Sequence, residues 1–150
     1  MPQSFAAVFV HTVFSTKHRE PIILDSWREE LFTVLGGNIK NCGCQTIIVG
    51  GIADHVHLLF GLSRTITIAD AIADIKRSSS AWVNQKHPSD APFHWQSGYG
   101  TFSVSQSNNE AVQEYIRGQE EHHRKQSFQE EYLEWLRRYG IVWDERYLWD

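Results

Sequence analysis

Hydrophobic and polar positions change their period several times along the chain, and each change predicts a new element. Residues 5–15, FAAVFVHTVFS, are rich in β-branched and aromatic side chains, which is typical of a strand, and TKHREP ends it. We expect Asp25 to cap the helix that follows, and Asn41 and Gly43 to end it. The apolar stripe of this helix has the spacing of helical turns and consists of Trp27, Leu31, Leu35 and Ile39.

Two short apolar runs follow, residues 44–49 and 55–62, and the segment GGIAD between them predicts a β-hairpin. Thr67 is expected to open a second helix, whose apolar stripe consists of Ile68, Ile72, Ile75, Trp82 and Val83. The segment FHWQSGYGTFSVS, residues 93–105, predicts a loop and a fourth strand. SNNE (107–110) and SFQE (127–130) each fit a capping box before a helix, and Gly140 is expected to end the last helix.

This order, β-α-β-β-α-β followed by helices, predicts an α+β fold with a ferredoxin-like antiparallel sheet. The length of 150 residues and the 41% hydrophobic content suit a single domain over residues 1–150. We expect helices to cover one face of the sheet and to leave the other free to bind a ligand. Because the sequence shows neither a signal peptide nor a membrane-spanning run, we expect a soluble, cytoplasmic protein.

Charge and cysteine content narrow the function only slightly. The net charge of -4 argues against a nucleic-acid partner, but the first hundred residues are neutral, with eight basic and eight acidic side chains. The excess of acid lies in the last fifty residues, so a local DNA groove elsewhere is compatible with it. Cys42 and Cys44 are one residue apart, and we expect reduced structural thiols there rather than a disulfide or a zinc site.

Candidate chemistry gathers first in DHVHLL, residues 54–59. Side chains two apart on a strand point the same way, so His55 and His57 would share a face and could bind one metal ion. An H-x-H pair alone is equally compatible with core or edge histidines. In VQEYIRGQEEHH, Tyr115 and Gln119 lie one helical turn apart. Core packing would explain Tyr115, whereas a buried Gln119 amide needs a polar partner, which a metal held by the histidines would supply.

The segments VFSTKHREPI, DHVHLL, FHWQSGYGTFSVS, YIRGQEEHH and SFQEEY together resemble the single-tyrosine HUH transposases of small insertion sequences that move as single-stranded DNA. On this resemblance, His55 and His57 match the family's histidine pair, Tyr115 its nucleophile on the C-terminal helices, and Gln119 its third metal ligand. The resemblance implies Mg²⁺ or Mn²⁺, and DNA strand transfer through a covalent 5′-phosphotyrosine. It also implies a homodimer with active sites completed in trans, acting on single-stranded DNA with a terminal hairpin.

Other side chains are candidates for DNA contacts, although solvated charges and core aromatics would explain them equally well. Candidate phosphate contacts are Lys17, Arg19, Lys76 and Arg77. Candidates for stacking on unpaired bases are Trp95, Tyr99 and Phe102. Asp54 either orients a histidine or is an ordinary turn residue.

Several other functions are open. A non-catalytic nucleic-acid-binding module would need aromatics on the central strands, where this chain carries His55 and His57. A metal-independent two-histidine phosphoesterase needs two H-x-[ST] motifs, which HTV at His11 and HVH at His55 do not provide. Replication initiators and relaxases usually carry a third histidine near the pair, whereas the spacing of Tyr115 and Gln119 favours a transposase. A domesticated relative that acts on chromosomal repeat hairpins is compatible with the same residues.

Overall fold

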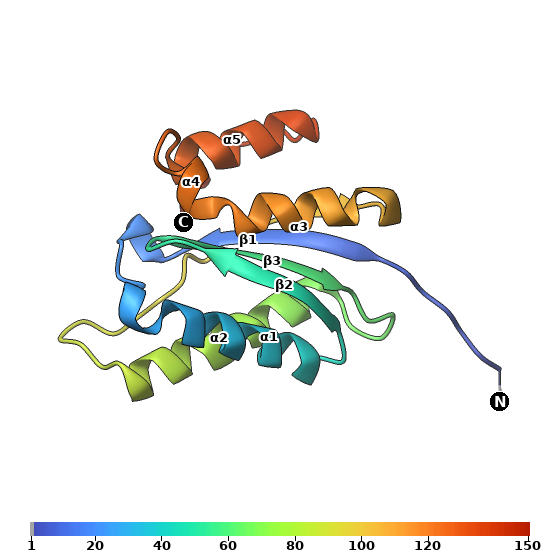
Figure 1. Ribbon diagram of the computed structural model, residues 1–150, viewed down its shortest axis with the longest axis horizontal. Coiled ribbons are helices and arrows are strands. Elements are labelled where there is room, and N and C mark those ends of the chain that lie inside the picture. Colours follow the sequence, from blue (N-terminus) through green and yellow to red (C-terminus); the bar gives the residue numbers. More distant parts are fainter. Residues whose placement is uncertain (1) are drawn as a thin grey trace.

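The computed structural model describes residues 2–150, and it contains one antiparallel sheet with helices on both faces (Figure 1). The strands are β1 (Phe9–Ser15), β2 (Gln45–Gly51), β3 (His55–Gly61) and β4 (Gly100–Val104), in the spatial order β2-β3-β1-β4. All three strand pairs are antiparallel, and β1 lies between β3 and β4. This order confirms the predicted ferredoxin-like sheet and the α+β class.

Helices α1 (Asp25–Asn41) and α2 (Ile68–Lys86) cover one face of the sheet (Figure 1). The predicted stripe of α1 is buried there, together with the β3 side chains Val56, Leu58 and Phe60. Thr67 caps α2, because its hydroxyl accepts a hydrogen bond from the backbone N–H of Asp70 at 3.0 Å. The expected cap at Asp25 is wrong: Asp25 is already helical, and Leu24 before it has no side-chain acceptor to offer.

The opposite face of the sheet, which was expected to be free, is covered as well. Helices α3 (Asn109–Arg117), α4 (Gln119–His122) and α5 (Phe128–Arg138) lie across it (Figure 1). Two apolar clusters hold them, consisting of Val13, Phe102, Phe128, Tyr132, Trp135 and Leu136, and of Leu59, Val104, Val112 and Ile116. The expectation failed because α3 and α5 are amphipathic, and the second face of the sheet is where their apolar stripes are buried.

The two predicted capping boxes have different outcomes. At the start of α5, the Ser127 hydroxyl accepts from the Glu130 N–H at 3.2 Å, and the Glu130 carboxylate accepts from the Ser127 N–H, as predicted. At Ser107 the prediction is wrong, because Gln106–Asn108 forms a short 3-10 helix, η2, and no side chain caps α3. Gly140 follows α5 with φ of 66°, which fits its predicted role as a helix stop.

The two glycines of GGIAD have different roles. A Cβ on Gly51 would collide with the carbonyl oxygen of His55. A Cβ on Gly50 would lie 2.7 Å from Cγ2 of Ile116 and 2.9 Å from the Ile116 carbonyl oxygen. The first glycine therefore lets α3 approach β2 closely, and the second permits the turn that leads into His55.

Two smaller features complete the fold. The first strand begins at Phe9 rather than at Phe5, and Phe5 is exposed. A short 3-10 helix, η1 (Lys17–Arg19), follows β1. Among residues 2–150, no helix has both the length and the apolar character that crossing a bilayer would demand.

Candidate active site

The histidine pair lies on β3, on the face of the sheet that α3 and α5 cover. His55 and His57 are both fully buried. Nδ1 of His55 lies 2.7 Å from a carboxylate oxygen of Asp54, so Asp54 orients this ring. Nδ1 of His57 lies 2.7 Å from Nε2 of His11 on the neighbouring strand β1. Both rings are thus held through one nitrogen, and each directs its Nε2 towards the C-terminal helices.

Tyr115 and Gln119 reach the same place from the last turn of α3 and the start of α4. The centroid of the Tyr115 ring lies 5.8 Å from that of His57. The amide oxygen of Gln119 lies 2.9 Å from Nε2 of His55. The structure therefore brings all four predicted site residues together within one chain. The resemblance implied that a partner's tyrosine helix would complete the site, whereas here the tyrosine of the chain lies beside its own histidines.

Glu131 of α5 is at the centre of this cluster, and the sequence analysis did not single it out. One carboxylate oxygen, Oε1, lies 3.0 Å from Nε2 of His57 and 3.4 Å from Nε2 of His55. The other, Oε2, accepts hydrogen bonds from the hydroxyl of Tyr115 and from the amide of Gln119, the latter at 3.1 Å. The available signal was position: Glu131 is a carboxylate on the apolar stripe formed by Phe128, Tyr132, Trp135 and Leu136.

Two further histidines surround the pair. His11 is fully buried, and its ring stacks on that of His57 with centroids 5.0 Å apart. His123 follows α4, and its Nε2 lies 3.3 Å from Oε1 of Glu131. The sequence analysis considered His11 only within HTV and did not single out His123. Neither strand nor helix spacing could relate them to residues 55–57, because the fold alone brings them together.

Burial and hydrogen bonding shift the pKa values of the titratable groups in this cluster. Burial alone would lower the pKa of His55, but hydrogen bonds to Asp54 and Glu131 outweigh it and raise the pKa to about 9. Burial lowers the pKa of His57. The pKa of Glu131 is lowered despite its burial, because His57, His123 and His55 favour the carboxylate. Burial, followed by the charge of Glu131, raises the pKa of Tyr115, so the phenol is protonated near neutral pH.

The donor atoms fit a divalent cation. Nε2 of His55, Nε2 of His57 and a Glu131 oxygen all lie within 4.8 Å of one another. Two ligands that share one ion at about 2.1 Å and at right angles are separated by about 3.0 Å. The separations between the site's neighbouring donors, from 2.9 to 3.4 Å, are close to this value. Because Nδ1–H of His55 donates to Asp54, the neutral ring presents a lone pair at Nε2, as a metal ligand must.

The four candidate phosphate contacts differ in their surroundings. Lys76 has another role, because its ammonium donates to the carbonyls of Gln96, Ser97 and Gly98 at 2.7–3.2 Å. Arg77 is exposed and paired with Asp74 at 2.7 Å.

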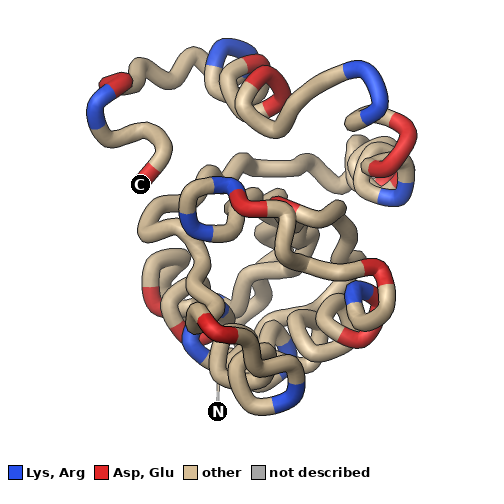
Figure 2. Tube along the Cα trace, turned by 90° about the vertical axis from the view of Figure 1, so that its left-hand side faces the viewer, with Lys and Arg blue, Asp and Glu red and all other residues tan. Residues whose placement is uncertain are grey.

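Lys17 and Arg19 lie on η1, and Arg19 stacks 5.3 Å above the ring of Trp149. Trp95 and Phe102 are buried in the core rather than free to stack on bases, and Tyr99 packs against the core. Figure 2 shows Lys and Arg interspersed with Asp and Glu along the chain.

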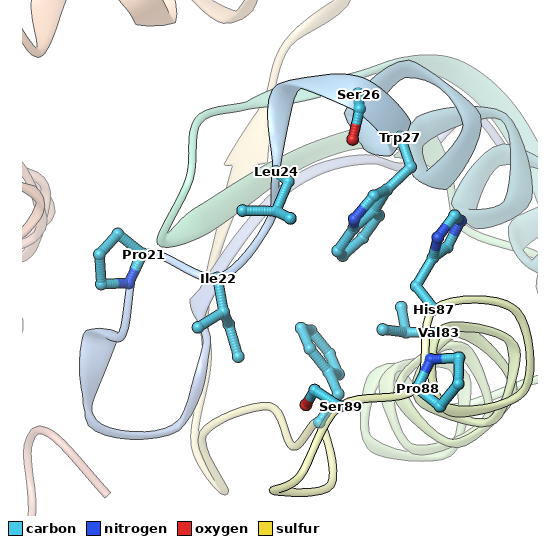
Figure 3. A pocket seen from close by; sticks show the side chains of 10 residues that line it. Pro21, Ile22, Leu24, Ser26, Trp27, Val83, His87, Pro88 and Ser89 are labelled. Atoms are coloured by element: carbon cyan, nitrogen blue, oxygen red, sulfur yellow. The ribbon is translucent and has the colours of Figure 1, made fainter.

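An apolar hollow of about 450 Å³ lies away from this cluster, between the start of α1 and the end of α2 (Figure 3). Trp27 and His87 stack on its wall with ring centroids 4.8 Å apart. None of the donor groups gathered around Glu131 lines this hollow. The candidate catalytic and metal-ligating groups therefore lie between β3 and the C-terminal helices, away from this hollow.

Comparisons with known proteins were made for both sequence and fold. Residues 4–119 match the family described as "Transposase IS200 like". The structure is similar to that of a "putative transposase" from Deinococcus radiodurans R1, with a TM-score of 0.61 and 22% identity over 79% of this chain and 96% of that one. It is also similar to the REP-associated tyrosine transposase bound to a REP hairpin, with a TM-score of 0.60 and 11% identity over 82% and 73% of the respective chains. No curated protein sequence matches this chain.

Proposed function

Because the chain belongs to the IS200-like transposase family, we propose that it cuts and rejoins single-stranded DNA at insertion-sequence ends through a covalent 5′-phosphotyrosine. Tyr115 is the nucleophile in this proposal, and His55, His57 and Gln119 hold the metal ion, with Glu131 as a further oxygen donor. The whole chain, residues 1–150, acts as one catalytic domain. The observation that supports the proposal is that the Tyr115 hydroxyl donates to Glu131, which together with His55 and His57 forms a buried group that could hold a metal ion.

In the cleavage step, the phenolic oxygen of Tyr115 forms a bond to phosphorus, and the bond from phosphorus to the 3′-oxygen breaks. The phenolic hydrogen already points to Oε2 of Glu131, which is the nearest acceptor for the proton. The indole N–H of Trp135 donates to the same phenolic oxygen at 3.2 Å and stabilises negative charge that develops there. The departing 3′-oxygen takes a proton from water and becomes a free hydroxyl.

Rejoining reverses these bonds. A 3′-hydroxyl attacks the phosphotyrosine, a new phosphodiester forms, and the phenolic oxygen of Tyr115 leaves and regains its proton. Since the phosphotyrosine keeps the energy of the broken phosphodiester, the cycle needs no ATP. A bound Mg²⁺ or Mn²⁺ supplies positive charge that polarises the phosphate. In the metal-free chain the raised pKa of Tyr115 keeps the nucleophile protonated, so cutting without that charge would be slow.

The proposed substrate is a single-stranded DNA end that carries a hairpin. A solved relative of the same fold is bound to a REP hairpin, which supports a hairpin as the element to be recognised. Chromosomal repeat hairpins are the second candidate substrate for the same chemistry.

A gel assay of covalent attachment tests the nucleophile. The protein is incubated with Mn²⁺ or Mg²⁺ and a labelled hairpin oligonucleotide drawn from the DNA that flanks the gene, and the products are denatured. We expect a protein–DNA adduct attached at the 5′ side of the cut. Tyr115→Phe should form none, whereas Tyr139→Phe, which removes an exposed hydroxyl that bonds only the Ser103 carbonyl, should react normally. An adduct with Tyr115→Phe would overturn the assignment, and hairpin binding without any cleavage would favour the binding module.

The resemblance implies a homodimer, and we propose that the subunits, if paired, cut with their own tyrosines. The contact between Tyr115 and Glu131 of the same chain supports this. A mixture of Tyr115→Phe and His57→Ala proteins tests it. Sites completed in trans would regain adduct formation in mixed dimers, because one composite site would contain an intact tyrosine and an intact histidine pair. Sites completed within one chain would stay inactive.

A further inference from the structure

We propose that His123 is an additional metal ligand, and that the centre therefore selects a transition-metal ion over Mg²⁺. This inference rests on the proposed metal site at His55 and His57, and it adds a ligand beyond residues 4–119, which match the family. It concerns a side chain that the proposed mechanism does not otherwise use.

The position of His123 is the first argument. Its side chain is only 4% exposed, and the centroid of its ring lies 4.6 Å from that of His55. Its Nε2 has no hydrogen-bond partner, although it points at Oε1 of Glu131 from 3.3 Å. Ligation of a metal ion would give this buried ring nitrogen a partner. Oε1 of Glu131 thus has three imidazole Nε2 atoms within 3.4 Å, those of His55, His57 and His123.

The hydrogen bond at the other ring nitrogen is the second argument. Nδ1 of His123 lies 2.6 Å from the backbone carbonyl oxygen of Gln126, which can only accept, so Nδ1 carries the hydrogen. In the neutral ring, Nε2 then has a lone pair. His55 is arranged in the same way, because its Nδ1–H donates to Asp54. A metal ion that displaced the proton from His55 would therefore meet the Nε2 lone pairs of both rings beside one carboxylate oxygen, an arrangement that metal-binding histidines share.

The fold fixes His123 in this orientation through α5. Gln126, whose carbonyl oxygen holds Nδ1, directly precedes Ser127, the N-cap residue of α5. The same helix carries Glu131 one turn further on. The N-terminus of α5 therefore positions both the carboxylate and the acceptor that orients His123.

The donor set decides which ion is preferred. Mg²⁺ binds oxygen ligands and keeps several waters, whereas imidazole nitrogen suits later transition-metal ions such as Fe²⁺, Ni²⁺ and Zn²⁺. A pair of histidines with amide oxygen and phosphate is compatible with Mg²⁺, but a third imidazole shifts the site towards transition metals. Mn²⁺ is the probe for this inference because its binding can be measured directly without DNA.

The experiment measures Mn²⁺ binding to the full chain by the EPR signal of free Mn²⁺, and counts bound imidazoles by pulsed EPR through their nitrogen couplings. We expect one Mn²⁺ with three imidazoles in the parent protein, and Mg²⁺ should compete at least about a hundredfold more weakly. His123→Gln should weaken Mn²⁺ binding by about tenfold or more and leave two imidazoles. His122→Gln, the neighbouring exposed histidine, should change the affinity by less than about twofold.

Two imidazoles in the parent protein, or unchanged Mn²⁺ affinity in His123→Gln, would overturn the inference. The number of imidazoles bound to Mn²⁺ in the parent protein does not depend on how any variant folds. His57→Ala separates this result from the proposed function. If His57→Ala abolishes Mn²⁺ binding and His123→Gln does not affect it, only the role of His123 fails. If the parent protein binds no Mn²⁺, the proposed metal site itself fails.

Discussion

Replacing Gly50 by alanine tests whether the close packing of α3 on β2 sets the geometry of the site. The new Cβ would lie 2.7 Å from Cγ2 of Ile116 and 2.9 Å from the Ile116 carbonyl oxygen, both inside the 3.0 Å that real Cβ atoms keep. The side chain of Ile116 can rotate, but its carbonyl belongs to the backbone of α3 and can move only with the helix. Overpacking of this kind costs about 1–3 kcal/mol of folding free energy.

The displacement also reaches the site. Tyr115 directly precedes Ile116, and Gln119 lies three residues beyond it, so both move with the end of α3 while His55 stays on β3. A misplacement of about 1 Å between reacting groups can cost about a hundredfold in rate. We therefore expect Gly50→Ala to be destabilised and also to lose at least about tenfold in the rate of adduct formation.

Urea unfolding measures the stability of this variant, and single-turnover adduct formation under native conditions measures its activity. The matched control is Gly37→Ala on α1, where an added Cβ meets nothing within 4 Å. That change should stabilise the protein by about 0.5–1 kcal/mol and leave adduct formation unaltered, because alanine favours a helix. The reasoning is refuted if Gly50→Ala is as stable as Gly37→Ala, or if it is destabilised but reacts at the parent rate.

Four further tests concern the site and the contacts that support it. In EDTA, the pKa of His55 is raised to about 9, so the protonated ring stabilises the fold fully below pH 6.5. This contribution, at most about 3 kcal/mol, is lost as the pH rises through 9. Equal urea midpoints at pH 6.5 and 9.5 would contradict this. Ser127→Ala removes the cap of α5 and should cost about 1 kcal/mol in thermal or urea unfolding, whereas no loss would show that the cap is dispensable. Lys76→Met should destabilise the fold without changing how DNA affinity depends on salt, whereas Lys17→Ala should reduce that salt slope by about one if it contacts phosphate.

The elements that could be predicted from the sequence are those with a local cause. The stripe Trp27 to Ile39 has helical spacing because α1 buries one side, and the period of a strand places His55 and His57 on one face. The caps at Thr67 and Ser127 follow from hydroxyls that meet backbone N–H groups three residues on. These relations depend on a few neighbouring residues, so they can be recognised without the fold.

The parts that could not be predicted depend on contacts between distant segments. No spacing relates Glu131 to His57, which lies 74 residues earlier, or His11 to the same ring. Lys76 was taken for a DNA contact because its charge is visible in the sequence, while the three carbonyls that it holds are not. The clearest missed signal was a single carboxylate on the apolar stripe of α5.

That buried carboxylate explains why the last helices belong to the site. Glu131 is 1% exposed, and a buried carboxylate is stable only with a positive partner. Without metal, the raised pKa of His55 shows that a proton on this ring supplies the positive charge. A divalent ion that binds Nε2 of His55 must displace that proton, so metal binding releases a proton below about pH 9 and becomes tighter as the pH rises. An ion bound there would take over the stabilising role of the proton, and the docking of α5 would then depend on occupancy of the proposed metal site.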